Sequence, residues 1–149
     1  MKKIEEEIQQ KKFRSPNQKA VINLIYTANW LQHKQLSFFK SYGITGQQFN
    51  ILRVLRGQYP GSITPTEMKS RMLDRNSDVS RLLDRLTTKN LIVKKTCASD
   101  KRSADIFITE KGLDLLKEID KKQKEFDGVL SLSAEEAIQL SDLLDKCRQ

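Results

Sequence analysis

Apolar residues recur every three or four positions over most of this chain, which is the spacing of one face of an α-helix. Two short runs, 91–96 and 105–108, are rich in β-branched residues and predict strands joined by a polar turn. Residues 62–64 are candidates for a third strand. The predicted helices span residues 15–43, 45–57, 64–72, 77–89, 109–130 and 133–147. The chain is therefore expected to be mainly α, with one two- to three-stranded sheet.

Several predicted helices begin with a capping box. In this pattern a Ser or Thr side chain accepts a hydrogen bond from a backbone N–H three residues on, and the Glu or Gln there returns one. Capping boxes are predicted at Ser15, Thr45, Thr64 and Ser133. Ser77 is expected to cap the helix over 77–89, and Asn90 is expected to end it in the left-handed conformation.

The helix over 77–89 has two chemically distinct faces. Its apolar residues, expected in the core, are Val79, Leu82, Leu83 and Leu86. The first residues of a recognition helix contact base edges in the major groove of DNA, and an arginine there can donate two hydrogen bonds to a guanine. The candidates for DNA contact are Arg75, Asn76, Ser77, Asp78, Ser80, Arg81 and Arg85. The alternative is a solvated face on which Arg81 pairs with Asp78 or Asp84.

The polar turn between the predicted strands carries Asp100, Lys101 and Arg102. An arginine at the tip of a hairpin can enter the minor groove, where narrow A·T tracts deepen the negative potential. An acidic residue two positions away can orient its guanidinium. Two short helices followed by a basic hairpin therefore predict a winged helix-turn-helix that binds double-stranded DNA. An exposed turn with ordinary charges is the alternative for the tip.

The net charge of +8 favours a polyanionic partner. The charge is uneven, because residues 113–149 carry more acidic than basic side chains. Two rival hypotheses keep the same fold. In one, the winged helix contacts protein or RNA, and in the other, Cys97 switches DNA binding by oxidation, because nearby lysines would lower the pKa of its thiol.

Four motifs occur in an order and spacing that resemble the MarR family of bacterial transcriptional regulators. They are VSRLLDRL at 79–86, LI at 91–92, DKR at 100–102 and ITEKG at 108–112. Two further stretches resemble the family, at 48–52 and at 133–136. The chain departs from the family pattern at Asn90, where glycine is usual, and has no cysteine in its first long helix, so peroxide sensing through such a cysteine is not expected.

The resemblance implies a homodimeric repressor that binds an inverted repeat and releases it when a ligand or an oxidant acts. It implies long dimerisation helices in residues 1–43 and 113–149, on either side of a DNA-binding domain over 44–112. By position, Asp100 and Arg102 match the family's wing pair, with Arg102 in the minor groove. The dimerisation candidates are Val21, Leu24, Ala28, Leu140, Leu143 and Leu144.

The family also implies a small aromatic or anionic effector. Tyr26 and Trp30 are candidates for its binding site, and Arg53 or Arg56 could meet a carboxylate, although packing of the aromatic rings in a dimer core is the alternative.

No enzyme, cofactor or metal site is expected from the sequence. His33 is the only histidine, and the two cysteines, Cys97 and Cys147, lack metal-ligand spacing. Cys147 is expected to pack on its helix. We expect a cytoplasmic protein that does not enter a membrane, because no signal peptide or long apolar run is present.

Overall fold

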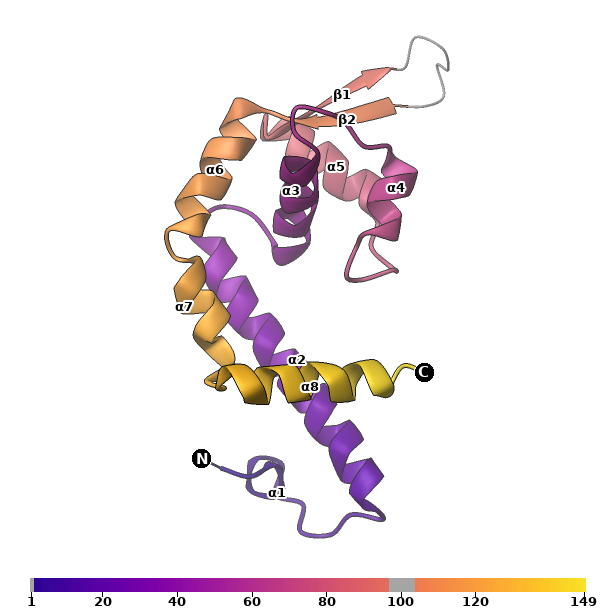
Figure 1. The fold of residues 1–149 in the computed structure, drawn as a ribbon, viewed down its shortest axis with the longest axis vertical. Helices are drawn as coiled ribbons and strands as arrows, with labels where there is room; N and C mark the ends of the chain where they lie inside the picture. The colour runs from indigo at the N-terminus through magenta and orange to yellow at the C-terminus, as the bar shows by residue number, and fades with distance from the viewer. Residues whose placement is uncertain (1, 97–103) are drawn as a thin grey trace. The chain divides into compact units, whose positions relative to one another are not determined.

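The computed structural model describes residues 2–96 and 104–149, which are mainly helical and carry one small antiparallel sheet (Figure 1). The chain divides into two compact units, residues up to Phe49 and residues from Asn50 on. The elements are α1 (Ile4–Glu7), α2 (Pro16–Lys40), α3 (Gly46–Gln58), α4 (Pro65–Ser70), α5 (Val79–Thr88), β1 (Ile92–Thr96), β2 (Ala104–Ile108), α6 (Glu110–Asp120), α7 (Gln123–Asp127), a 3-10 turn (Gly128–Leu130) and α8 (Ala134–Lys146). The predicted mainly α fold with a winged helix-turn-helix is confirmed.

The first unit contains a helical turn that the sequence pattern did not predict. This turn, α1, buries Ile4, and its Glu5 carboxylate forms an ion pair with Lys19 of α2. The Tyr26 hydroxyl donates to Glu7 Oε2 at 3.0 Å. Two polar contacts therefore attach the segment before α2 to α2. The sequence did not predict α1 because a single helical turn is too short to show an apolar period.

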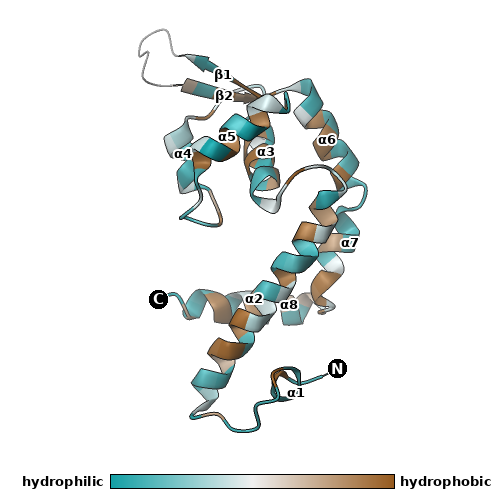
Figure 2. Cartoon of the chain, turned by 180° about the vertical axis from the view of Figure 1, so that it is seen from behind, coloured by the Kyte–Doolittle hydropathy of each residue, from teal (hydrophilic) through white to brown (hydrophobic). Residues whose placement is uncertain are grey.

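Ser15 caps the long helix α2, but only half of the predicted capping box forms, and α2 keeps much apolar surface exposed. Ser15 Oγ accepts from the Gln18 N–H at 3.1 Å, but the Gln18 side chain accepts from Arg14 rather than from Ser15. Val21, Leu24 and Ile25 each expose about half of their surface, and Figure 2 shows hydrophobic segments along this helix. A 25-residue helix with this much uncovered apolar surface is unusual for an isolated chain.

The second unit has one apolar core, to which α3, α4, α5, the sheet and α6 all contribute. Its most buried side chains include Ile51, Leu52, Leu55, Met68, Leu83, Leu86, Ile92, Ile106, Leu116 and Ile119. The sheet pairs β1 with β2 in the register Ile92 to Ile108 through Thr96 to Ala104. Ile63 adds a single bridge to Ile106, with N–O distances of 3.1 and 3.0 Å, where a third strand was a candidate.

Capping boxes predicted at three helix starts are formed. They are the pairs Thr45 with Gln48, Thr64 with Glu67, and Ser133 with Glu136. Hydrogen bonds from the backbone and hydroxyl of Thr64 lower the pKa of Glu67. These boxes satisfy backbone N–H groups that the first turn of a helix leaves without partners.

The prediction of one helix over 109–130 is wrong, because the helix that begins there is shorter. Thr109 does cap it, accepting from the Gly112 N–H at 3.1 Å, but α6 ends at Asp120. The chain then forms α7 and a 3-10 turn, which ends at Ser131 with a φ of 52°. A short turn between two helices can preserve the apolar period, so spacing alone does not distinguish one helix from two.

Gly112 lies where α6 passes against the start of the sheet. A Cβ atom there would lie 2.4 Å from the Leu91 carbonyl oxygen and 2.7 Å from Ile108 Cγ1. Neither neighbour is the far end of a flexible side chain, so any larger residue must displace the backbone. The close approach is a physical reason for glycine at this point of the ITEKG motif.

We expect Gly112→Ala to lower the free energy of unfolding by about 1–3 kcal/mol, because it over-packs a tight contact. The matched control is Gly57→Ala, on an exposed helical position with no heavy atom within 4 Å of its added Cβ. That variant should be neutral or more stable by up to about 1 kcal/mol. Urea unfolding at one fixed protein concentration measures both, and equal effects would contradict the packing argument.

Candidate nucleic-acid interface

Helices α4 and α5 form a helix-turn-helix, held in place by a buried amide of α3. Asn50 is 5% exposed, and its Nδ2 donates to the Arg71 carbonyl oxygen at 3.4 Å, just past the end of α4. Within the turn, Asp74 Oδ1 accepts from the Asn76 N–H at 2.9 Å. The buried amide and the Asp74 turn together define the connection between the two helices.

The first turn of α5 is capped by Asp78 rather than by Ser77, which corrects the sequence prediction. Asp78 Oδ1 accepts from the Arg81 N–H at 3.1 Å. Ser77 is only 8% exposed, and its N–H donates to the Asp74 carbonyl oxygen at 3.1 Å. Its side chain therefore does not share the outer surface with the other candidates for DNA contact.

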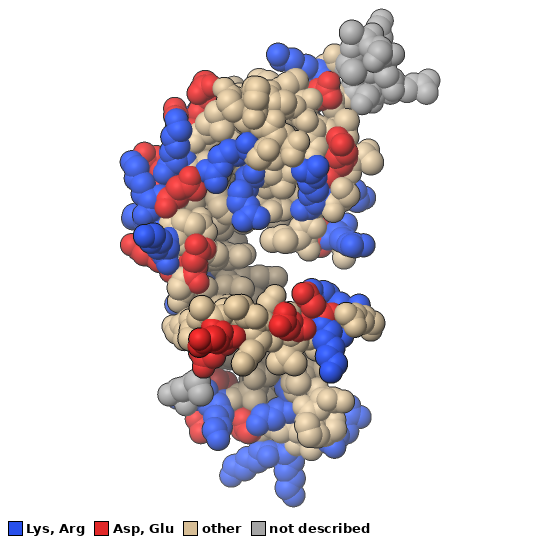
Figure 3. Space-filling view, viewed as in Figure 1, with Lys and Arg blue, Asp and Glu red and all other residues tan. Residues whose placement is uncertain are grey.

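The two faces of α5 are separated as predicted. Val79, Leu82, Leu83 and Leu86 are buried. The opposite face exposes polar and charged side chains, and the exposed DNA-contact candidates are Arg75, Asn76, Asp78, Ser80, Arg81 and Arg85. Among the residues that the structure describes, the three arginines of this set have no ion-pair partner. Figure 3 shows basic and acidic side chains interspersed over the visible surface.

One ion pair connects α5 to the sheet. Lys94 Nζ of β1 lies 2.5 Å from Asp84 Oδ1. Sequence reasoning missed this contact, because Asp84 was considered only as a partner for Arg81 on the same helix. Lys95, the next residue of β1, lies over the Phe107 ring at 5.0 Å. Both lysines of β1 therefore have defined contacts.

The predicted tip of the hairpin lies outside the described residues. This applies to Asp100, Lys101 and Arg102, and also to Cys97. Their proposed roles remain predictions from the sequence. The strands that flank them, β1 and β2, extend to Thr96 and from Ala104.

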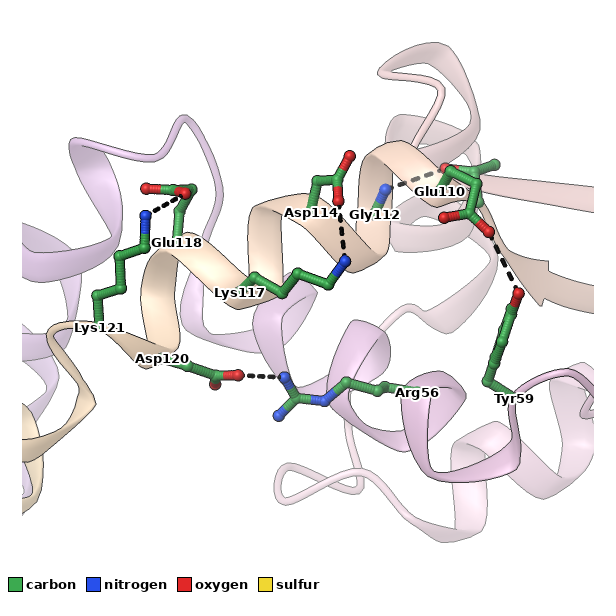
Figure 4. Close-up of polar contacts among 10 residues, drawn as sticks. Arg56, Tyr59, Glu110, Gly112, Asp114, Lys117, Glu118, Asp120 and Lys121 are labelled. Atoms are coloured by element: carbon green, nitrogen blue, oxygen red, sulfur yellow. Dashed lines mark hydrogen bonds and ion pairs between the residues drawn. The ribbon is translucent and has the colours of Figure 1, made fainter.

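Two polar contacts join the end of α3 to α6 (Figure 4). Arg56 Nη1 lies 2.6 Å from Asp120 Oδ2, and the Tyr59 hydroxyl donates to Glu110 Oε1 at 3.2 Å. The hydrogen bond to Glu110 raises the pKa of Tyr59. Arg56 was a candidate for binding an effector carboxylate, but its guanidinium is already paired with a carboxylate of its own chain.

The remaining candidate residues are on the surface. Tyr26 and Trp30 of α2 are 39% and 37% exposed, and Arg53 of α3 is exposed. His33 is exposed, and so is Cys147, which was expected to pack on its helix. In the described part of the chain, no three His, Cys, Asp or Glu side chains are grouped to hold a metal ion. Within the same residues, no helix has the length and apolar character that crossing a membrane requires.

A helix-turn-helix followed by a two-stranded hairpin defines the class of winged helix-turn-helix proteins. A model of the MarR family matches residues 42–103. The HTH-type transcriptional regulator PecS of Dickeya dadantii is 28% identical over 111 residues, covering 72% of this chain and 67% of PecS. The HTH-type transcriptional repressor MdtR of Bacillus subtilis is 32% identical over 82 residues, covering 55% of this chain and 52% of MdtR.

A solved structure extends the similarity to most of the chain. A mutant MarR from E. coli in complex with operator DNA is 27% identical, with a TM-score of 0.72, and the match covers 84% of this chain and 91% of that one. The family model over residues 42–103 and these relatives support a MarR-type DNA-binding transcriptional regulator.

The Asp78 cap generates a prediction for the stability of this interface. Asp78→Ala should lower the free energy of unfolding by about 1 kcal/mol, because one N–H of the first turn loses its acceptor. Asp78→Asn is the matched control, since its amide oxygen can accept the same hydrogen bond while its charge is lost. Urea unfolding should show nearly wild-type stability for Asp78→Asn, and equal losses in both variants would exclude capping as the cause.

Proposed function

We propose that this protein is a homodimeric repressor that binds an inverted repeat in double-stranded DNA and releases it on binding a small effector. The observation that carries the proposal is the two-faced character of α5. Its apolar face is buried in the second unit, and its outer face presents arginines without ion-pair partners among the described residues. A helix anchored in this way can enter the major groove without giving up its own packing.

The proposed contacts with DNA fall into three groups. Ser80 and Arg81 would meet base edges, and Arg81 can donate two hydrogen bonds to a guanine. Arg75, Asn76 and Arg85 would contact phosphates beside the groove. Arg102, with Asp100 and Lys101, would contact the minor groove. Ser77 is left out of this set because its side chain is buried.

A second copy of the chain is the proposed occupant of the apolar surfaces of α2 and α8. Val21 and Leu24 of α2 are 56% and 47% exposed, and Leu140 and Leu143 of α8 are 38% and 61% exposed. Ala28 and Leu144, on the same helices, complete the proposed interface. Exposed apolar side chains on both helices favour burial by association.

DNA binding and dimer formation are assigned to different parts of the chain. Residues 44–112 would bind DNA, while residues 1–43 and 113–149 would form the dimer. Since a symmetric dimer repeats one surface twice, two copies of α5 would read two half-sites related by inversion. Centre-to-centre spacing of about 34–36 Å would match one turn of DNA.

The proposed effector is a small aromatic or anionic molecule. Half-exposed aromatic rings of α2, Tyr26 and Trp30, offer stacking surface, and Arg53 offers an unpaired cation among the described residues. Trp30 is the only tryptophan, so its fluorescence would report an aromatic ligand bound close to it. An effector can release DNA only if it binds the DNA-free conformation more tightly. The repressor role is supported by the name of the relative MdtR.

Selection from a random duplex library, followed by affinity measurement against salt, tests the proposal. We expect enrichment of an inverted repeat with half-sites about 10 bp apart. Affinity should fall steeply with salt, since each phosphate contact contributes about −0.9 to the slope of log affinity against log salt concentration.

The Arg102→Ala variant serves as an internal comparison in this experiment. It should bind the selected duplex more weakly, with the largest loss on duplexes that are A·T-rich at the wing positions. Unchanged affinity would remove the wing from the proposed interface. An absence of any enriched sequence, together with weak binding that salt does not affect, would contradict the proposed DNA contacts.

The dimer is tested separately by placing a charge on the exposed face of α8. Leu143→Lys should shift the protein from dimer to monomer, because an ammonium group would be buried without a partner in the interface. Leu73→Lys is the matched control, as Leu73 is 85% exposed in the turn after α4. Sedimentation velocity over a concentration series measures both. A dimer that survives Leu143→Lys unchanged would place the interface elsewhere.

A further inference from the structure

Arg81 lies between two carboxylates on its own helix, and both carboxylates are occupied by other groups. Asp78 precedes it by three residues, and Asp78 Oδ1 accepts from the backbone N–H of Arg81 at 3.1 Å. Asp84 follows it by three residues, and Asp84 Oδ1 lies 2.5 Å from Lys94 Nζ. Both spacings allow a side-chain ion pair with Arg81 on a helix surface. Within the described residues, neither pair with the Arg81 guanidinium forms.

The partner of Asp84 comes from a different element. Lys94 is in β1, opposite Ile106 of β2, and its side chain is 32% exposed, whereas that of Asp84 is 71% exposed. The core residues Leu83 and Ile92 hold α5 and β1 in place, so the ammonium group reaches Asp84 from a fixed strand. An ammonium supplied by the sheet therefore competes with Arg81 for this carboxylate.

We propose that Lys94 is a positioning residue for DNA recognition. By pairing with Asp84, it keeps the Asp84 carboxylate from pairing with Arg81. The same pairing neutralises the negative charge that would otherwise repel DNA phosphate. The inference rests on the proposed contact of Arg81 with DNA. Without Lys94, the Asp84 carboxylate would have Arg81 as a cation at helical spacing. A guanidinium held by Asp84 would have fewer free donors for a base edge.

A mutant cycle on the selected duplex tests this role. Lys94→Met keeps an unbranched side chain and removes the charge, and we expect it to weaken binding about fivefold, the lower end of what one base contact contributes. Asp84→Asn in the same chain should restore the affinity, because the competing carboxylate is gone. Lys94→Met should also cost less in an Arg81→Ala background than in the wild-type background.

Lys117→Met is the matched control for charge. Lys117 pairs with Asp114 on α6 at 3.3 Å, and its removal changes the net charge by the same amount away from α5. We expect it to leave affinity nearly unchanged, and a loss equal to that of Lys94→Met would overturn the inference. Far-UV circular dichroism and urea unfolding confirm that each variant is folded.

The salt dependence separates positioning from direct phosphate contact. If Lys94 itself contacted phosphate, Lys94→Met would make the salt slope shallower by about 0.9, and the added Asp84→Asn change would not restore affinity. That pattern would overturn the inference while leaving the DNA interface intact. If Arg81→Ala has no effect on affinity, the proposed groove contact fails as well. Loss of affinity in Arg81→Ala without loss in Lys94→Met would overturn only the role of Lys94.

Discussion

The burial of one face of α5 is the constraint on which the rest of the interface depends. Leu83 and Leu86 are almost completely removed from solvent, and full burial of one such side chain stabilises a fold by about 1.5–3 kcal/mol. Rotating the helix about its axis would expose these leucines, so its orientation is fixed. Ser80, Arg81 and Arg85 are therefore held on the outside, where a polyanion can reach them. The packing of the leucines, rather than any property of the arginines, decides which side chains of α5 are exposed on its outer face.

The elements around α5 are joined to it by a few close contacts within the second unit. Asn50 holds the turn before it, and Lys94 links it to β1 through Asp84. Gly112 lets α6 approach the carbonyl oxygen of Leu91, at the start of the sheet. Arg56 and Tyr59 connect the end of α3 to α6. A change in the position of α6 would therefore disturb the core that holds α5 in place.

The charge distribution on and around α5 is mixed rather than uniformly basic. Carboxylates are interspersed with the basic side chains, and Asp78 and Asp84 lie on the same helix face as Arg81. Each acidic group lowers the sequence-independent attraction to phosphate, which is the part of the affinity that most depends on salt. A genome offers a vast excess of non-specific sites. A mixed surface with a few arginines outside ion pairs therefore favours specific over non-specific binding to DNA.

Local patterns in the sequence determined the capping boxes, the left-handed Asn90, the apolar face of α5 and the paired strands of the hairpin. The caps, the end of α5 and its apolar face depend on residues only a few positions apart, and the two strands are consecutive along the chain, so periodicity and turn chemistry are sufficient to predict them. The tertiary structure alone decided the pairing of Lys94 with Asp84 and the pairing of Arg56 with Asp120. It also decided that Ser77 is buried while Asp78 caps α5, and that the chain turns after Asp120. These outcomes depend on which elements meet in space, because a side chain with several partners at suitable spacing takes the one that packing brings closest.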